Sequence, residues 1–267
     1  MKLLKTVALA ACVVSMHGQA PAERAWNVLS AGAQDKSYEK RGKALHALGV
    51  ISANDRARTL AENALSDERE EVRTTAADVL GVMRAKQSIP KLKHSLVSEA
   101  STSVIFAAAN ALFVMGDPDA YRVYYAVLTG EKKSGDALVE SQMKMLKDPK
   151  ALSKLGLEAG VGFIPFGGVS LKAFKMATAD TVSPVRAAAL FKLVGDPDPK
   201  SAQAIAAATK DPKWIVRAAA VGAIAMRHDP SMVKHVIPLL DDEEDAVRFN
   251  AAAAVIALQA TPGGRGK

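Results

Sequence analysis

A short helical phrase that returns six times constrains this chain more than any other feature. Its fullest form is the eleven-residue sequence EVRTTAADVLG at 71–81, and each copy carries an arginine, or once an isoleucine, at its third position. Neighbouring copies lie 32, 32, 31 and 31 residues apart, with one gap of 81 residues. A fixed period of this size is typical of a solenoid built from stacked structural repeats. The third positions are Arg41, Arg73, Ile105, Arg186, Arg217 and Arg248.

Apolar residues within the phrase recur at helical spacing. Val72, Ala76, Val79 and Leu80 stand at positions i, i+4, i+7 and i+8, which places them along one face of an α-helix. The same positions hold Val104, Ala108, Ala111 and Leu112, then Val216, Ala220, Ala223 and Ile224, and then Val247, Ala251, Ala254 and Val255. The remaining copies are Val185, Ala189 and Leu193, with Lys192 off-pattern, and Lys40, Ala44, Ala47 and Leu48. Because the first copy has Lys40 in place of a valine, we interpret it as a terminal repeat with one side facing water.

Turn residues and a second apolar segment follow the phrase. The sequences MGDP at 115–118 and VGDP at 194–197 combine glycine, which suits a helix C-terminus, with proline, which cannot continue a helix. The segments 88–92 and 236–240 are expected to be second helices with a proline near their start, where proline is tolerated. Acidic residues that are expected to cap the next helix follow at Asp67, Asp211 and 241–245. Each unit is therefore predicted to be helix, turn, helix, turn.

The order of acid, Val-Arg, Ala-Ala and Leu-Gly resembles the HEAT-like repeat family, in particular its short bacterial type. The resemblance covers about 38–130 and 180–260. It implies an all-α fold in which about six to seven helical hairpins stack into a superhelical α-solenoid over residues 21–260. In that family the arginine of each repeat usually pairs with acids of the neighbouring repeat. The resemblance therefore implies a structural ladder of Arg41, Arg73, Arg186, Arg217 and Arg248.

The first twenty residues have the three-part layout of a secretory signal peptide. Two lysines precede an uncharged, mostly apolar run at 6–16, and Gly18 and Ala20 supply small residues ahead of a cleavage site at Pro21. The apolar run is too short to span a bilayer. We therefore predict export, to the periplasm or cell envelope of a bacterium.

Cys12, the single cysteine, provides an alternative to simple cleavage. The sequence LAAC at 9–12 resembles a bacterial lipobox, in which the cysteine is lipidated. If the signal is instead removed after Ala20, the mature chain has no thiol for a disulfide or a metal site. At the opposite end, the segment 261–267 is small and polar and is predicted to be disordered.

The gap of 81 residues interrupts the pattern with a divergent, glycine-rich repeat at about 131–180. The stretch 159–171 contains no charged residue and includes Phe163 and Phe166. Its glycines fit neither of the phosphate-binding patterns GxGxxG and GxxxxGK[ST]. Two interpretations stay open: the stretch packs inside the stack, or it contacts a partner or a membrane surface.

No constellation of catalytic or metal-binding residues stands out. His228 and His235 lie seven residues apart, and nothing nearby completes the three or four ligands of a metal site. HEAT-like deoxyhypusine hydroxylases hold iron on His-Glu dipeptides, and this sequence contains none. Trp26 and Trp214 are interpreted as packing residues rather than as the base-binding site of a glycosylase. Since the GxSxG motif of hydrolases is also absent, we predict no catalytic residue, no metal and no cofactor.

These observations favour a non-catalytic scaffold that binds another protein or peptide on its helical face. The predicted contact residues are aromatic side chains and polar side chains of a concave row of second helices: Tyr121, Tyr124, Tyr125, Phe163, Phe166, Lys91, His94, Lys234 and His235. Two alternatives stay open, a lyase-type enzyme built on the repeats and a basic solenoid that binds nucleic acid or anionic lipid. The net charge of +7 gives mild support to an anionic partner, whereas export argues against nucleic acid. The stretch 159–171 or a lipidated Cys12 would supply a membrane contact.

Overall fold

Helices and tight helical turns account for every regular element that the structure describes. The structure is a computed structural model, and it describes residues 20–51, 53–129 and 182–260. None of the helices in these ranges is long and apolar enough to cross a membrane. Several predicted features lie outside the described residues: the signal with Cys12, the glycine-rich segment 131–180 with Phe163 and Phe166, and the tail 261–267.

The described helices form two blocks along the chain. The first block comprises α1 (Pro21–Ala33), α2 (Tyr38–Leu48), α3 (Asp55–Ala64), α4 (Glu70–Val82), η2 (Lys86–Ser88), α5 (Ile89–Ser98), α6 (Thr102–Val114) and α7 (Asp119–Thr129). The second block comprises α11 (Val182–Lys192), α12 (Pro199–Ala208), α13 (Trp214–Arg227), η4 (Pro230–Met232), α14 (Val233–Val236), η5 (Ile237–Asp241) and α15 (Asp245–Gln259), where η marks a short 3-10 helix. Each copy of the phrase forms one helix, and we call these the anchor helices: α2, α4, α6, α11, α13 and α15.

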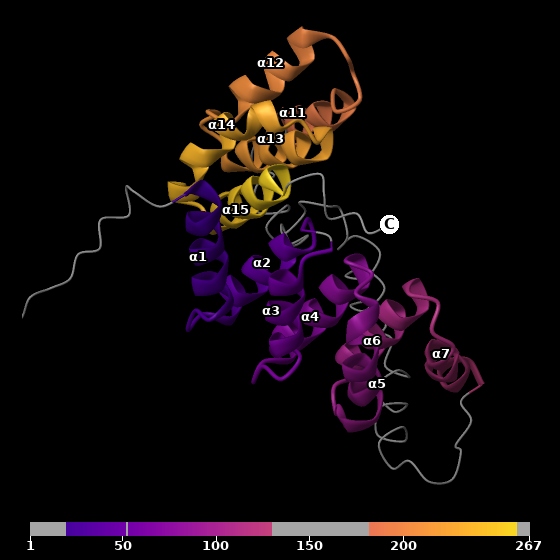
Figure 1. Ribbon diagram of the computed structural model, residues 1–267. Helices are drawn as coiled ribbons and strands as arrows, with labels where there is room; N and C mark the ends of the chain where they lie inside the picture. Colours follow the sequence, from indigo (N-terminus) through magenta and orange to yellow (C-terminus); the bar gives the residue numbers. More distant parts are fainter. Residues whose placement is uncertain (1–19, 52, 130–181, 261–267) are drawn as a thin grey trace, which may run out of the picture.

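The anchor helices pack side by side in a single row. The order of packing along the row is α11, α13, α15, α2, α4 and α6. Figure 1 shows the stack running from the second block, in orange and yellow, to α6 and α7 at its far end. The other helices lie beside the row, with α3 against α4, α5 against α6, and α12 against α13. The fold is therefore an α-solenoid. The order of its repeats in space differs from their order along the chain, because α15, the last described helix, packs against α2 near the start of the chain.

Burial of the predicted apolar face explains most of the anchor helices. This face is buried in α4, α6, α13 and α15, at Val72, Ala76, Val79, Leu80, Val104, Ala108, Ala111, Leu112, Val216, Ala220, Ala223, Ile224, Val247, Ala251, Ala254 and Val255. Gly81 allows α4 to approach α6 closely, because a Cβ at this position would lie 2.9 Å from the Cα of Ala111. Alanine and glycine at the contacts thus allow a dense stack despite the low aromatic content.

Helix α11 departs from this pattern. Val185 is 67% exposed and Ala189 is exposed as well, so the prediction that these residues pack inside the stack was wrong. The physical reason is the position of α11 at one end of the described row. Among the described helices it packs chiefly on α13, and the opposite face is left uncovered.

Acidic residues fix the turns that lead into three anchor helices. Asp67, Asp211 and Asp242 each accept a hydrogen bond from the backbone N–H two residues later, at 2.9, 2.9 and 3.0 Å. This bond from an acid to a nearby N–H is an Asx turn, which sets the direction of the chain at the helix entrance. The prediction that these acids cap the helices was wrong, because the N-cap residues are Arg69, Lys213 and Glu244, and none of them makes a side-chain capping hydrogen bond. Each acid lies two residues earlier and orders the turn before the helix.

The second segments differ in regularity. Helix α5 carries Pro90 in its first turn, in agreement with the prediction for 88–92. The segment 236–240 was predicted to be one helix, but α14 ends at Val236 and Pro238 lies in the 3-10 turn η5. The reason is that Pro238 has no N–H to donate to the preceding turn, so a regular α-helix does not continue through it.

The two blocks meet where α15 packs against α1 and α2, and we call this interface the seam. At the seam Gly32 of α1 faces the ring of Phe249 and the methyl group of Ala44, and Arg24 of α1 donates to both carboxylate oxygens of Asp241 at 2.8 and 2.9 Å. The interpretation of the first copy as a terminal repeat with one side facing water was wrong. Helix α2 lies inside the row, between α15 and α4, and its apolar face is buried.

Candidate functional site

Four of the five repeat arginines bind an acid of the following repeat. The pairs are Arg41–Asp67, Arg73–Glu99, Arg186–Asp211 and Arg217–Asp242. Arg41, Arg73 and Arg217 bind their acids through the same two nitrogens, and in the last of these pairs Nε and Nη2 of Arg217 donate to Asp242 at 2.7 and 2.8 Å. Its third nitrogen, Nη1, donates to the backbone oxygens of Asp211 and Pro212, at the entrance of its own helix. Each such guanidinium therefore fastens its own entry turn to the next repeat, which is a structural role.

The acids of two of these pairs, Asp67 and Glu99, have a lowered pKa despite their burial. Burial alone would raise the pKa of Asp67, but hydrogen bonds from Arg41 and from the backbone of Arg69 outweigh it and lower the pKa. The same balance, with Arg73 as the principal donor, lowers the pKa of Glu99. A carboxylate held in this way is a stable partner for a cation and a poor proton donor near neutral pH.

Arg248 does not follow the pattern expected for the ladder. It binds Asp245 of its own helix and the backbone oxygens of Asp242 and Glu243. Asp35, the acid ahead of α2, accepts a hydrogen bond from the backbone N–H of Ser37 instead. In the other pairs the acid follows its arginine by 25 or 26 residues, but across the seam the neighbouring repeat belongs to the other block. That spacing therefore cannot supply a partner to Arg248.

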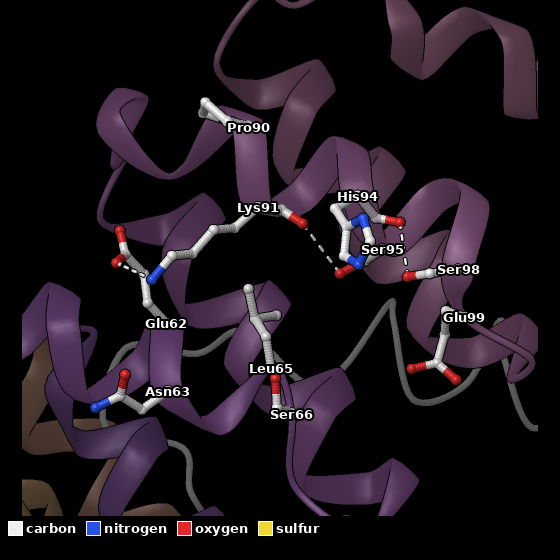
Figure 2. Close-up of a pocket in the computed structure, with 10 residues that line it drawn as sticks. All are labelled: Glu62, Asn63, Leu65, Ser66, Pro90, Lys91, His94, Ser95, Ser98 and Glu99. Carbon is white, nitrogen blue, oxygen red and sulfur yellow. Dashed lines mark hydrogen bonds and ion pairs between the residues drawn. The ribbon is translucent and has the colours of Figure 1, made fainter.

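A groove of about 640 Å³ runs between α3 and α5 (Figure 2). It is lined by Glu62, Asn63, Leu65, Ser66, Pro90, Lys91, His94, Ser95, Ser98 and Glu99. The carboxylate of Glu62 is 6% exposed and accepts hydrogen bonds from three donors. These are Nη1 of Arg58 at 2.5 Å, Oγ of Ser88 at 2.6 Å and Nζ of Lys91 at 2.7 Å. The network ties α3 to η2 and α5.

The charge on Glu62 is fixed by this network. Burial alone would raise its pKa, but hydrogen bonds from Lys91, Ser88 and Arg58 outweigh burial and lower the pKa to about 2. A general acid or base is most effective when its pKa lies near the pH of the reaction. Glu62 is therefore unsuited to proton transfer. The groove is a polar surface, and the hydrogen bonds to Glu62 stabilise the helices that form it.

The polar contact residues predicted on the second segments lie in two separate places. Lys91 and His94 line the groove on α5, and the Lys91 ammonium is bound to Glu62 (Figure 2). Lys234 and His235 lie on α14 in the second block, away from α5. The structure therefore does not bring the four side chains together into one site.

Aromatic side chains of α6 and α7 gather into one cluster, which we call the aromatic surface: Phe113, Tyr121, Tyr124 and Tyr125. The three tyrosines are spaced by three and four residues, which places them on one side of α7. The ring centroid of Phe113 lies 5.8 Å from that of Tyr121 and 5.8 Å from that of Tyr124, in edge-to-face orientations. Phe113 is 48%, Tyr121 47% and Tyr125 62% exposed.

The contribution of α6 to this surface was missed by the sequence prediction. Phe113 contacts the tyrosines directly, and the ring centroid of Phe106 lies 5.8 Å from that of Tyr124. A signal was present, because Phe106 and Phe113 are seven residues apart and fall on a stripe distinct from the buried one.

A tight turn holds α6 and α7 in the orientation that brings these rings together. Gly116 has a φ of +78°, a conformation that glycine adopts without steric cost. The backbone N–H groups of Gly116 and Asp117 donate back to the last turn of α6, each at 2.9 Å. Lys93 of α5 binds Asp117 at 3.0 Å and Asp119 at 2.9 Å, which fastens the turn to the neighbouring helix.

One exposed carboxyl group has an unusual pKa. Desolvation raises the pKa of Asp78 on α4 to about 6, although the side chain remains exposed. The surrounding protein crowds this carboxylate without covering it, so contact with water limits the energy involved. Within the described ranges, no group of three or more His, Cys, Asp and Glu side chains is placed to hold a metal ion. A single carboxyl group does not constitute a catalytic site.

The stacked helix pairs with their arginine ladder define an α-solenoid of short repeats. The profile of HEAT repeats matches residues 26–113 and 172–257, so the chain belongs to the HEAT-repeat family and is a repeat scaffold. Among solved structures it is similar to human deoxyhypusine hydroxylase in complex with glycerol, at 15% identity and a TM-score of 0.35, over 89% of this chain and 96% of that chain. A likeness this distant supports no assignment of activity. No curated protein sequence matches the chain.

Proposed function

We propose that this chain is an exported, non-catalytic scaffold that binds a protein or peptide through the aromatic surface of α6 and α7. The observation that carries the proposal is the exposure of Phe113, Tyr121 and Tyr125, at 48%, 47% and 62%. Exposed aromatic clusters mark interaction sites, and aromatic side chains supply much of the binding energy in protein interfaces. Edge-to-face contacts also fix the rings in advance, which lowers the entropy cost of binding.

The non-catalytic part of the proposal is supported by the state of the buried charges. Glu62, Asp67 and Glu99 have lowered pKa values and are bound by cations that hold the repeats together. Asp78, whose pKa is raised, is accompanied by no hydrogen-bonding side chain in the described part of the chain. A lyase-type enzyme on the same repeats would need several reactive side chains close together. Discovery of such a cluster would favour the enzyme over the non-catalytic scaffold.

The export part of the proposal is supported by the layout of the first twenty residues. Fractionation of bacterial cells that express the full chain tests it directly. Export predicts a shortened protein in the periplasmic fraction, and lipidation at Cys12 predicts a membrane-bound protein that Cys12→Ser releases. A full-length protein in the cytoplasm would overturn this part and leave the binding proposal untouched.

Binding is tested by affinity capture with the tagged mature chain from bacterial envelope extracts. Tyr121→Ala with Phe113→Ala removes the centre of the aromatic surface, and Val97→Ala is the matched control, since Val97 is 66% exposed on α5 outside the cluster. A genuine partner is retained by the control and lost from the double variant, with a drop of at least tenfold in recovery, which corresponds to about 1.4 kcal/mol. Circular dichroism of both variants verifies that the fold is kept.

The same capture separates the alternative functions. Equal recovery of every protein by the double variant and by wild type would exclude the aromatic surface as the binding site. Recovery of nucleic acid or anionic lipid, with a steep loss of binding as salt rises, would favour a basic solenoid instead.

A further inference from the structure

We infer that the two repeat blocks are separable halves, 20–129 and 182–260, which the seam holds together without need of an intact chain between them. This inference concerns the assembly of the molecule and is independent of the proposed binding function. It begins from the packing order, in which α15 of the second block is followed in space by α2 of the first.

The character of α15 is the first argument. In a linear stack the outermost helices carry a polar outer face, because one side meets water. Helix α15 instead buries residues on every side, including Phe249, Asn250, Ala252 and Ala253. A helix that is apolar all round belongs in the interior of a protein. The second block therefore presents a surface that is complete only when α1 and α2 cover it.

The fit at the seam is the second argument. The ring of Phe249 is 3% exposed and occupies the space that the absent side chain of Gly32 leaves open. A Cβ on Gly32 would lie 2.4 Å from Cε1 of Phe249 and 2.9 Å from the Cβ of Ala44. Three elements from both blocks thus interlock at one point, as the two sides of a specific interface do.

The bonds that cross the seam are the third argument. The buried arginine ladder does not cross it, because Arg248 is bound to Asp245 on its own helix. Between the described parts of the two blocks, the pair Arg24–Asp241 forms a polar link, in which the Asp241 side chain is 73% exposed. An apolar centre with a polar link at its margin is the arrangement found where two folded proteins associate.

The inference is tested by cutting the folded full chain. A protease recognition sequence is inserted between residues 150 and 151, and the folded protein is cut in solution. A denaturing gel shows when cleavage is complete. Size-exclusion chromatography with mass spectrometry is expected to show both fragments in one peak at a 1:1 ratio, with the helical circular dichroism of the uncut chain. Separation of the wild-type fragments into two peaks would overturn the inference.

Seam variants show whether the predicted contact holds the fragments together. Gly32→Leu is expected to abolish co-elution after cutting, whereas Gly42→Leu, at a helix position with no heavy atom within 4 Å of a Cβ, is expected to behave as wild type. Persistent co-elution in Gly32→Leu would place the association elsewhere and refute the inference.

A charge exchange guards against a simple folding defect. Arg24→Glu places two like charges together and is expected to weaken association of the cut fragments by about fivefold, the size of an exposed ion pair. Adding Asp241→Arg restores an opposite pair in the reverse order and is expected to return the affinity to the wild-type value. A double variant no tighter than Arg24→Glu alone would contradict the assignment of this pair to the interface.

Discussion

Gly32 and Phe249 come from different blocks and share a space that has no room for one more carbon atom. The ring of Phe249 is buried among α1, α2 and α15, so it cannot swing aside into solvent. A methyl group added at Gly32 therefore tests whether the two blocks pack as the structure shows.

Gly32→Ala is expected to destabilise the protein by about 1–3 kcal/mol, the usual cost of an overpacked core. Thermal unfolding should show a fall in Tm of roughly 2–4 °C per kcal/mol. Gly42→Ala is the control, because its added methyl group meets nothing within 4 Å and helix propensity alone would raise stability by about 0.5–1 kcal/mol. Equal Tm values for the two variants would show that the ring and the glycine are not in contact.

Arg217→Met is expected to cost about 3–5 kcal/mol in urea unfolding, because the partner carboxylate of Asp242, 6% exposed, would remain buried without its cation. Arg186→Met is the matched comparison within the same ladder. Its partner Asp211 is as buried as Asp242, at 5% exposed, but the Arg186 side chain that covers it is 48% exposed. Removal of Arg186 therefore opens the carboxylate to water, and we expect a smaller loss, of about 1 kcal/mol. Similar losses for both variants would mean that burial does not govern the strength of the ladder.

Acid should weaken the fold over a defined range of pH. The pKa of Glu62 is lowered from 4.5 to about 2, so its contribution is fully present above about pH 4.5 and is lost as pH falls through about 2. The full contribution is up to about 3 kcal/mol, and Asp67 and Glu99, also lowered, act in the same direction.

Glu62→Gln tests this assignment by denaturant unfolding at a series of pH values. The variant should be less stable than wild type at pH 7 and should lose less stability between pH 4.5 and pH 2. Glu39→Gln, at an exposed position on α2, is the control and should follow the wild-type curve. If the free energy of unfolding of the Glu62 variant falls with pH as steeply as that of wild type, other groups are responsible for the acid sensitivity.

Gly116→Ala is expected to destabilise the protein by about 1–2 kcal/mol, because alanine adopts a φ of +78° only with strain. The same change should loosen the aromatic surface, visible as a weaker near-ultraviolet circular dichroism signal from tyrosine. Gly195→Ala is the control, since that glycine has no positive φ and open space around it. An unchanged tyrosine signal in Gly116→Ala would dissociate the turn from the ordering of the rings.

The buried faces of α4, α6, α13 and α15 could be predicted from the sequence because the information is local. Residues such as Val72 and Leu80 repeat with the helical period, and each repeat packs mainly on its neighbours. The turn at Gly116 was predictable for the same reason, since glycine followed by Asp-Pro indicates a helix end.

The seam could not be predicted in this way. Arg24 and Asp241 are 217 residues apart, and no periodic spacing connects them. The lysine at position 40 suggested an exposed end repeat, but α1 and α15 cover that side of α2. A contact between blocks depends on the curvature of the stack, which a single repeat does not encode.

The candidate site was predicted in part. The tyrosines of α7 could be identified because three of the four tyrosines of the chain lie at 121–125, but Phe113 was obscured by the buried residues beside it, including Leu112. Lys91 was identified as a contact residue because it is charged, although its charge is engaged with Glu62. Partners of charged groups depend on packing between helices, and a sequence pattern does not specify them.

The position of α15 beside α2 has a consequence for how the molecule folds. An ordinary repeat array can grow outward from any point, because each new helix pair needs only the one made just before it. Here the apolar side of α1 and α2 must wait for a helix synthesised some two hundred residues later. Contacts between such distant residues raise the contact order and slow folding. Until α15 has been synthesised, the first block would expose apolar surface that favours aggregation. We therefore expect this chain to need chaperones during synthesis more than an array of short, local repeats would.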